Sequence, residues 1–181
     1  VNLPKDHPQS YYQYMYCNFF SLIDIPTGNI HLLNGMAEDI NAECEKYERD
    51  IESVGGIDLF LAGVGCDGHL AFNEPGSSLS SVTRVKTLCR ETIIQNSRFF
   101  QDNVLSVPTM AITVGLKTIM SSKEVLVMVN GETKAMALKE CLEGSVNHNW
   151  TVTVLQYHSK ALVACDSSAT SELRVKTVDY Y

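Results

Sequence analysis

Short apolar runs alternate with amphipathic stretches along most of this chain, and this alternation is the feature that most restricts its fold. Nearly continuous apolar runs are typical of strands buried on both faces of a parallel sheet. We expect strands at residues 57–64, 110–114, 125–129, 152–155 and 161–165, and helices at 38–53, 91–100, 116–121 and 133–142. The pattern predicts an α/β fold with a doubly wound, mostly parallel sheet flanked by helices.

Composition places the chain among globular proteins of one domain. Its 181 residues are 45% hydrophobic and 19% charged, so a single domain over residues 1–181 with a sizeable core is expected. The formal net charge of −7 and the absence of a lysine or arginine run argue against nucleic acid as a partner. No window is apolar over the 18 or more residues that a membrane span needs, so no membrane partner is expected.

The six cysteines are scattered and form no Cys-x-x-Cys pair. Reduced thiols are therefore a better interpretation than a disulfide framework, which favours a cytoplasmic protein.

A glycine-rich loop at residues 63–75 directly follows the apolar run at 57–62 and carries Asp67, His69 and Glu74. A loop can fold these three side chains around one point, where a histidine tuned by two acids would transfer protons. The plainer alternative is an ordinary strand-to-loop turn whose glycines supply positive φ. A metal site is a weaker alternative, because the spacing matches no standard metal motif.

A second candidate segment, residues 130–134, follows an expected strand and opens a helix. Free backbone N–H groups and the Lys134 ammonium could bind a phosphate or carboxylate there, although an exposed lysine in a first helical turn is the simpler interpretation. We expect this segment and the loop at 63–69 to face one crevice. Arg98 stands beside two phenylalanines, where an arginine more often buries its stem and keeps its head in water.

Together, the motifs of this chain resemble those of the glucosamine-6-phosphate deaminases. The resemblance covers essentially the whole chain and is carried by residues 3–12, 63–76, 83–88, 96–100, 146–148, 150–151 and 175–178. It implies a Rossmann-like, doubly wound sheet that is incomplete at the N-terminus, because the family's phosphate loop and its enolisation base lie before the position of Val1. We therefore expect a fragment, and expect the isolated 181-residue chain to be inactive.

The resemblance also implies an activity and roles for particular residues. Family members convert glucosamine 6-phosphate and water to fructose 6-phosphate and ammonia in amino-sugar catabolism, with no cofactor and no metal. The ring-opening base corresponds to His69, with Asp67 and Glu74 as its supporting acids. The matching substrate contacts are made by the backbone of Gly63 and, at the phosphate, by Arg98 and Lys134.

Regulation is implied by the same resemblance. Many members are hexamers activated by N-acetylglucosamine 6-phosphate, so a homo-oligomer with this effector is expected. The matching effector positions are Ser77, Arg84, Lys86 and Tyr180.

Two other functions remain open at this point. A 6-phosphogluconolactonase has a similar Gly-x-Asp-Gly-His loop, but the segment Asn73-Glu74-Pro75 argues against that hydrolase. A non-catalytic sugar-phosphate sensor is favoured by the missing enolisation base and opposed by the presence of Glu74.

Overall fold

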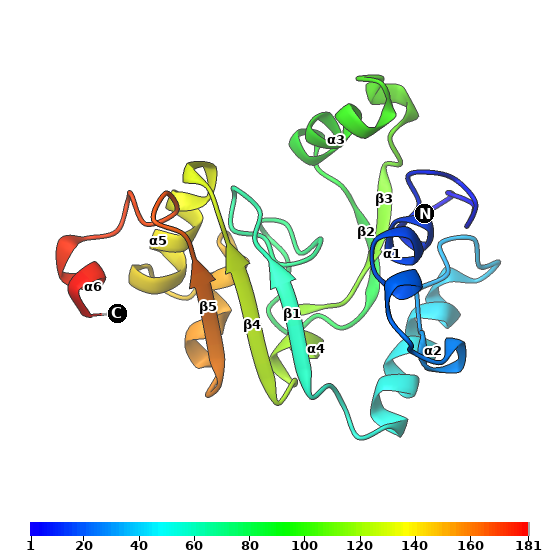
Figure 1. Ribbon diagram of the computed structural model, residues 1–181, viewed down its shortest axis with the longest axis horizontal. Helices are drawn as coiled ribbons and strands as arrows, with labels where there is room; N and C mark the ends of the chain where they lie inside the picture. Colours follow the sequence, from blue (N-terminus) through cyan, green and yellow to red (C-terminus); the bar gives the residue numbers. More distant parts are fainter. Residues whose placement is uncertain (181) are drawn as a thin grey trace. The chain divides into compact units, whose positions relative to one another are not determined.

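A computed structural model of the chain describes residues 1–180 and divides them into two compact units (Figure 1). The first unit comprises Val1–Tyr47 and Val85–Ile112, and the second begins with Glu48–Arg84 and resumes at Thr113. The helix α2 (Ile40–Ser53) begins in the first unit and ends in the second.

The second unit contains a three-stranded parallel sheet in the order β1 (Leu59–Gly63), β4 (Glu124–Val129), β5 (Ala161–Cys165), as Figure 1 shows. In the register of this sheet Gly63 pairs with Met128, and Val129 pairs with Cys165. All three strands therefore end at one edge, which is where ligands bind in open parallel sheets. The expected α/β fold with a mostly parallel sheet is confirmed.

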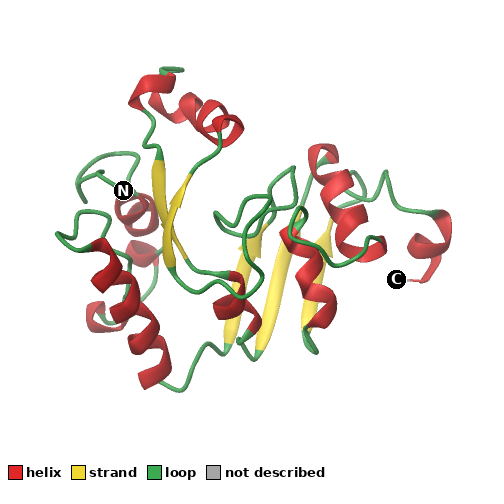
Figure 2. Ribbon diagram, turned by 180° about the vertical axis from the view of Figure 1, so that it is seen from behind, coloured by secondary structure: helices red, strands yellow, loops and turns green. Residues whose placement is uncertain are grey.

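One face of this sheet packs against helical segments and forms the core. The segments are α4 (Leu116–Met120), α5 (Ala135–Glu143) and the 3₁₀ helix η6 (Thr151–Tyr157), which Figure 2 shows in front of the strands. Alternate residues of β4 point into this core, where Val125, Val127 and Val129 are buried. Two further segments, η5 (Glu132–Lys134) and α6 (Val175–Tyr180), complete the elements of this unit.

The opposite face of the sheet is apolar and exposed. Its side chains include Leu59, Leu61, Met128 and Leu162, which are 54%, 60%, 58% and 63% exposed. The expectation that these strands are buried on both faces is therefore wrong for the described residues. The sequence runs are continuously apolar because the residues of the face that packs on helices alternate with exposed residues that are also apolar, such as leucine and methionine.

The run at 152–155 is the clearest error of the strand predictions, because it lies within η6 and forms no strand. A four-residue apolar run does not distinguish a buried strand from a buried helical segment. Local hydrogen bonds decide the outcome: the Thr153 hydroxyl donates to the carbonyls of Trp150 and Asn147 at 2.6 and 3.1 Å. Val152 and Val154 still bury their side chains, as their composition predicts.

The expected strand at 110–114 exists as β3 (Met110–Thr113), but it pairs with β2 (Arg84–Thr87) in a separate two-stranded sheet. The other elements of the first unit are helical: α1 (Tyr11–Asn18), η1 (Phe20–Leu22), η2 (Thr27–Asn29), α3 (Arg90–Ser97), η3 (Arg98–Phe100) and η4 (Val104–Ser106). Aromatic rings stack along α1, where the centroids of Tyr12 and Tyr16 are 4.5 Å apart.

The predicted helices at 38–53, 91–100, 116–121 and 133–142 correspond to α2, to α3 with η3, to α4 and to α5. The last of them stops at Gly144, whose N–H donates to the Glu140 carbonyl at 3.0 Å. A search of residues 1–180 finds no helix with the length and apolar character needed to cross a bilayer.

Candidate active site at the carboxyl edge of the sheet

A histidine and a carboxylate form a close pair in the loop that follows β1. The Nδ1 atom of His69 lies 2.6 Å from Oδ1 of Asp67, and the same oxygen accepts the backbone N–H of His69 at 3.4 Å. The contact is a close approach of two side chains and not an aligned hydrogen bond, because Nδ1 is buried with no hydrogen-bond partner among residues 1–180. An ionised carboxylate at this distance favours the tautomer with its proton on Nδ1, which leaves Nε2 as the nitrogen that can act as a base.

The pair also sets the ionisation of Asp67. Burial of the carboxyl works against its charged form, but the nearby His69 ring and the His69 backbone N–H outweigh burial and hold the pKa of Asp67 below its usual value. Asp67 is therefore a carboxylate at neutral pH, in the form that orients an imidazole.

Two glycines allow the loop to fold this tightly. A side chain at Gly65 would collide with the His69 ring and would lie 2.6 Å from Oδ1 of Asp67. Gly68 has φ of +77°, and the Trp150 ring packs against it so closely that an added Cβ would lie 2.6 Å from Cε3. The glycines thus have a steric reason here, beyond the general flexibility of a turn.

A distant segment of the chain, residues 148–152, is hydrogen-bonded to this loop at several points. The N–H of Val152 donates to the Gly68 carbonyl at 2.9 Å, and the N–H of Gly76 donates to the His148 carbonyl at 2.8 Å. Between them, Thr151 Oγ1 accepts the Leu70 N–H at 3.3 Å. The segment therefore holds both ends of the stretch that contains His69.

Asn73 and Glu74, a few residues after the pair in the sequence, are almost fully buried. The Asn73 amide donates to the carbonyls of Leu70 and Val114, each at 2.9 Å, and its oxygen accepts from Nη1 of Arg84 at 2.9 Å. Glu74 follows directly and is only 3% exposed. Burial of a carboxyl group is costly unless polar partners compensate for it, so the surroundings of Glu74 must supply such partners.

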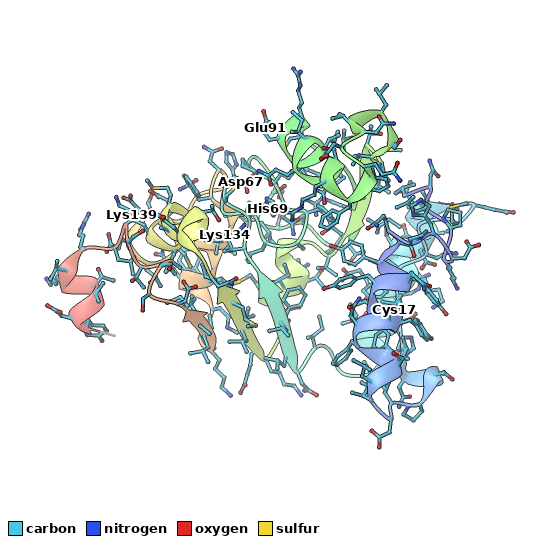
Figure 3. The ribbon with its side chains drawn as sticks, turned by 45° about the horizontal axis from the view of Figure 1, so that its top comes forward. Cys17, Asp67, His69, Glu91, Lys134 and Lys139 are labelled. Atoms are coloured by element: carbon cyan, nitrogen blue, oxygen red, sulfur yellow. The ribbon has the colours of Figure 1, made fainter. Side chains whose placement is uncertain are left out.

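The segment after β4 begins at the same sheet edge, because β1 and β4 are adjacent and parallel. Lys134 ends η5 and is partly buried, and its N–H donates to the Gly131 carbonyl at 3.0 Å. Gly131 has φ of +88°, a conformation that favours glycine. Figure 3 shows Asp67 and His69 on the loop after β1 and Lys134 at the start of α5. Whether the two segments line one crevice stays a prediction.

The remaining predicted site residues have varied surroundings. Gly63 ends β1 at this edge. Ser77 is buried, its N–H donates to the Glu74 carbonyl at 3.0 Å, and its hydroxyl has no hydrogen-bond partner among residues 1–180. Tyr180, in α6, is largely exposed.

Lys86 and Arg98 lie in the first unit, on β2 and η3, so their action together with the second unit stays a prediction. The Arg98 guanidinium lies over the Phe99 ring, 4.7 Å from its centroid, in the arrangement expected of an arginine that keeps its head in water. Within the described part of the chain, no group of three or more His, Cys, Asp or Glu side chains is arranged to hold a metal ion.

Sequence reasoning found the residues of the loop but missed those that hold it. The sequence points to Asn73 only within the segment Asn73-Glu74-Pro75, and to Thr151 only within the family resemblance. The signal for such residues is a polar side chain close in sequence to a candidate base. When it is buried it needs hydrogen-bond partners, and these fix the backbone around it.

Comparison with known proteins gives a consistent result. Residues 2–164 match the family model of glucosamine-6-phosphate isomerases and 6-phosphogluconolactonase. The glucosamine-6-phosphate deaminase of Glaesserella parasuis is 58% identical over all 181 residues, which cover 69% of its length. That of Parabacteroides distasonis is 56% identical, and 67% of its length is covered. The chain thus spans about two thirds of the length of these relatives.

Solved structures extend the comparison. One described as a monomeric glucosamine-6-phosphate deaminase superposes with a TM-score of 0.92 at 40% identity, covering 95% of this chain and 71% of its own. The 6-phosphogluconolactonase of Trypanosoma brucei superposes with a TM-score of 0.70 at 20% identity, over 95% of this chain and 71% of its own. The latter likeness concerns the fold alone.

Proposed function

The chain belongs to the family of glucosamine-6-phosphate isomerases and 6-phosphogluconolactonases, and we propose that it acts as a glucosamine-6-phosphate deaminase. The reaction converts glucosamine 6-phosphate and water to fructose 6-phosphate and ammonia. The observation that carries the proposal is the His69–Asp67 pair, held at 2.6 Å at the sheet edge where the Lys134 segment also begins.

The geometry of the pair suits the opening of the sugar ring. In that step the C1–O5 bond breaks and the C1 hydroxyl becomes a carbonyl, so one proton must move from the C1 hydroxyl to O5. Nε2 of His69 takes this proton and returns it to O5, while Asp67 holds Nδ1 and stabilises the imidazolium that forms. Glu74, buried two residues beyond Phe72, acts with the pair as a supporting acid.

Substrate binding is assigned to the three groups that the family resemblance implies. Lys134 supplies a cation for the phosphate, Arg98 supplies a second, and the Gly63 backbone contacts the sugar. A sugar phosphate is a small dianion, so two cations and free N–H groups match its charge.

The assay that tests this function measures ammonia released from glucosamine 6-phosphate by the purified complete enzyme, since the isolated 181-residue chain is expected to be inactive. The same preparation is offered 6-phosphogluconolactone, and a His69→Asn variant serves as control. Ammonia release that falls by about 10²-fold or more in His69→Asn supports the proposal. Lactone hydrolysis without ammonia release would favour the lactonase instead, and neither activity would favour a sensor.

Regulation by a second sugar phosphate is a finer part of the proposal. Ser77 donates its N–H to the Glu74 carbonyl, and Arg84 donates to the Asn73 side chain, so two of the four effector positions contact the dipeptide that contains Glu74. With Lys86 and Tyr180 they would bind N-acetylglucosamine 6-phosphate in a homo-oligomer, a hexamer by resemblance. Addition of this compound should lower the half-saturating substrate concentration, and unchanged kinetics would refute the regulation.

Placement in the cytoplasm also belongs to the proposal. None of the six cysteines forms a disulfide within the described residues, which agrees with a reducing compartment. Fractionation of the source cells, with immunodetection of the chain, tests this placement.

A further inference from the structure

Asp166, the residue directly after β5, makes an unusual set of contacts with the end of the neighbouring strand. Both oxygens of its carboxylate accept the N–H of Gly131, at 3.1 and 3.0 Å, and its own N–H donates to the Val129 carbonyl at 3.3 Å. One residue therefore holds the backbone on both sides of Asn130, where β4 ends and the next segment begins.

A further hydrogen bond links Gly131 to Lys134. Gly131 gives its N–H to Asp166 and uses its carbonyl to accept the N–H of Lys134 at 3.0 Å. Gly131 also has a positive φ, a backbone conformation that favours glycine. Asp166 is anchored in turn, because Oδ1 accepts the Ala169 N–H at 2.8 Å and Ala169 is fully buried.

We propose that Asp166 is a positioning residue for substrate binding, which fixes the Gly131–Lys134 turn and so places the Lys134 ammonium for the phosphate. This inference rests on the proposed function of Lys134. Asp166 itself does not touch the substrate, because its negative charge would repel a phosphate at close range, and its carboxylate is occupied by N–H groups.

The kinetic test compares Asp166→Ala and Asp166→Asn with the wild type, each in the complete enzyme, on glucosamine 6-phosphate. Loss of a charge-assisted hydrogen bond to the backbone should raise KM about tenfold in Asp166→Ala with kcat changed by less than about twofold. Asp166→Asn keeps one acceptor oxygen and should recover most of the loss. Asp58→Asn removes an equally charged, exposed carboxylate, whose partner is Lys123 at 2.5 Å, and should leave KM unchanged.

A double-mutant cycle with Lys134→Met then separates positioning from general destabilisation. If Asp166 acts through Lys134, Asp166→Ala should have almost no further effect on KM in the Lys134→Met background. Full additivity of the two changes overturns the proposal, as does an equal fall of kcat and kcat/KM with unchanged KM in Asp166→Ala.

A second readout does not depend on the activity. Hydrogen exchange of the peptide containing residues 130–135 should accelerate in Asp166→Ala and remain at the wild-type rate in Asp58→Asn. Unchanged exchange would show that Asp166 does not hold this turn, and would overturn the proposal. If exchange accelerates but the wild-type protein releases no ammonia, the proposed function has failed although Asp166 does hold the turn. The role of the turn is then tested by the binding of inorganic phosphate, which should be weaker in Asp166→Ala. Equal phosphate binding by the two proteins would overturn that role.

Discussion

The hydroxyl of Thr151 donates to the backbone carbonyl of Asn73 at 2.8 Å, although 78 residues separate them in the sequence. The same oxygen accepts the N–H of Leu70, so one buried side chain is hydrogen-bonded to both sides of the turn that follows His69. The candidate base is thus held in place by a residue from a remote part of the chain.

Replacement of Thr151 by valine should show how much this contact contributes to stability. Valine keeps the shape but leaves a buried N–H and a buried carbonyl without partners, which costs about 1–3 kcal/mol of the free energy of unfolding. Urea unfolding checks the loss, and kcat should fall with it because the loop is less well placed. Thr151→Ser keeps the hydroxyl and is the matched control; equal loss in both variants would mean that the methyl group matters and the hydrogen bonds do not.

The Asp67 carboxylate should stabilise the fold in a pH-dependent way. Because its pKa is lower in the folded chain than in the unfolded chain, its contribution is present above the unfolded value of about 3.9 and is lost as the pH falls through the folded value. The difference in the free energy of unfolding between wild type and Asp67→Asn should therefore be steady above about pH 5 and shrink below about pH 4. Urea titrations from pH 3 to pH 7 measure it, and a difference that grows on acidification would contradict the assignment.

Asp67→Asn should also reduce kcat by about 10²-fold or more, because an amide can hold His69 in the wrong tautomer. Steady-state ammonia release at saturating glucosamine 6-phosphate measures the change. An Asp67→Asn enzyme with the wild-type kcat would remove Asp67 from the mechanism.

Gly65 should tolerate no side chain. An alanine there would force apart His69 and Asp67, so Gly65→Ala should lower kcat by about 10²-fold or more and destabilise the fold by about 1–3 kcal/mol. Gly28→Ala is the matched control, since a methyl group at Gly28 meets no atom within 4 Å. Comparable losses in the two variants would show that the effect comes from loss of glycine flexibility and not from the collision.

The thiols should divide into reactive and protected groups. Burial raises the pKa of Cys141 to about 12, so almost no thiolate exists at pH 8, and its side chain is also inaccessible. A disulfide reagent such as dithionitrobenzoate should label the exposed Cys17 and Cys165 first, and Cys141 only when the chain unfolds. Mass spectrometry of the labelled peptides identifies the order, and rapid labelling of Cys141 in the native chain would contradict it.

The fold was largely predictable where one physical cause dominated. The segment at 57–64 could be assigned from its apolar run because a glycine-rich turn ended it, and α5 because a helical period ended at Gly144. Residues 152–155 carried the same kind of apolar signal, yet they lie in a helical segment in which the Thr153 hydroxyl donates to the nearby carbonyls of Trp150 and Asn147. A short window contains no information about such competition.

The candidate site was predictable only in part for a similar reason. Asp67 and His69 are two residues apart, so their pairing is local and visible in the sequence. Thr151 and Asp166 act on segments far from them in the sequence, and a single threonine or aspartate has no pattern that reveals its partner. Their roles appear only when the topology brings the segments together.

The order of strands in the parallel sheet has a consequence for the way this chain assembles. Strand β4 lies between β1 and β5, but residues 64–123 separate β1 from β4 along the chain, so β1 pairs with a remote partner. Closure of so long a loop is slow, whereas β4 and β5 are joined by a shorter connection. During synthesis, the His69 loop therefore leaves the ribosome long before the segments that hold it, and this edge of the sheet should be among the last parts to acquire its native structure.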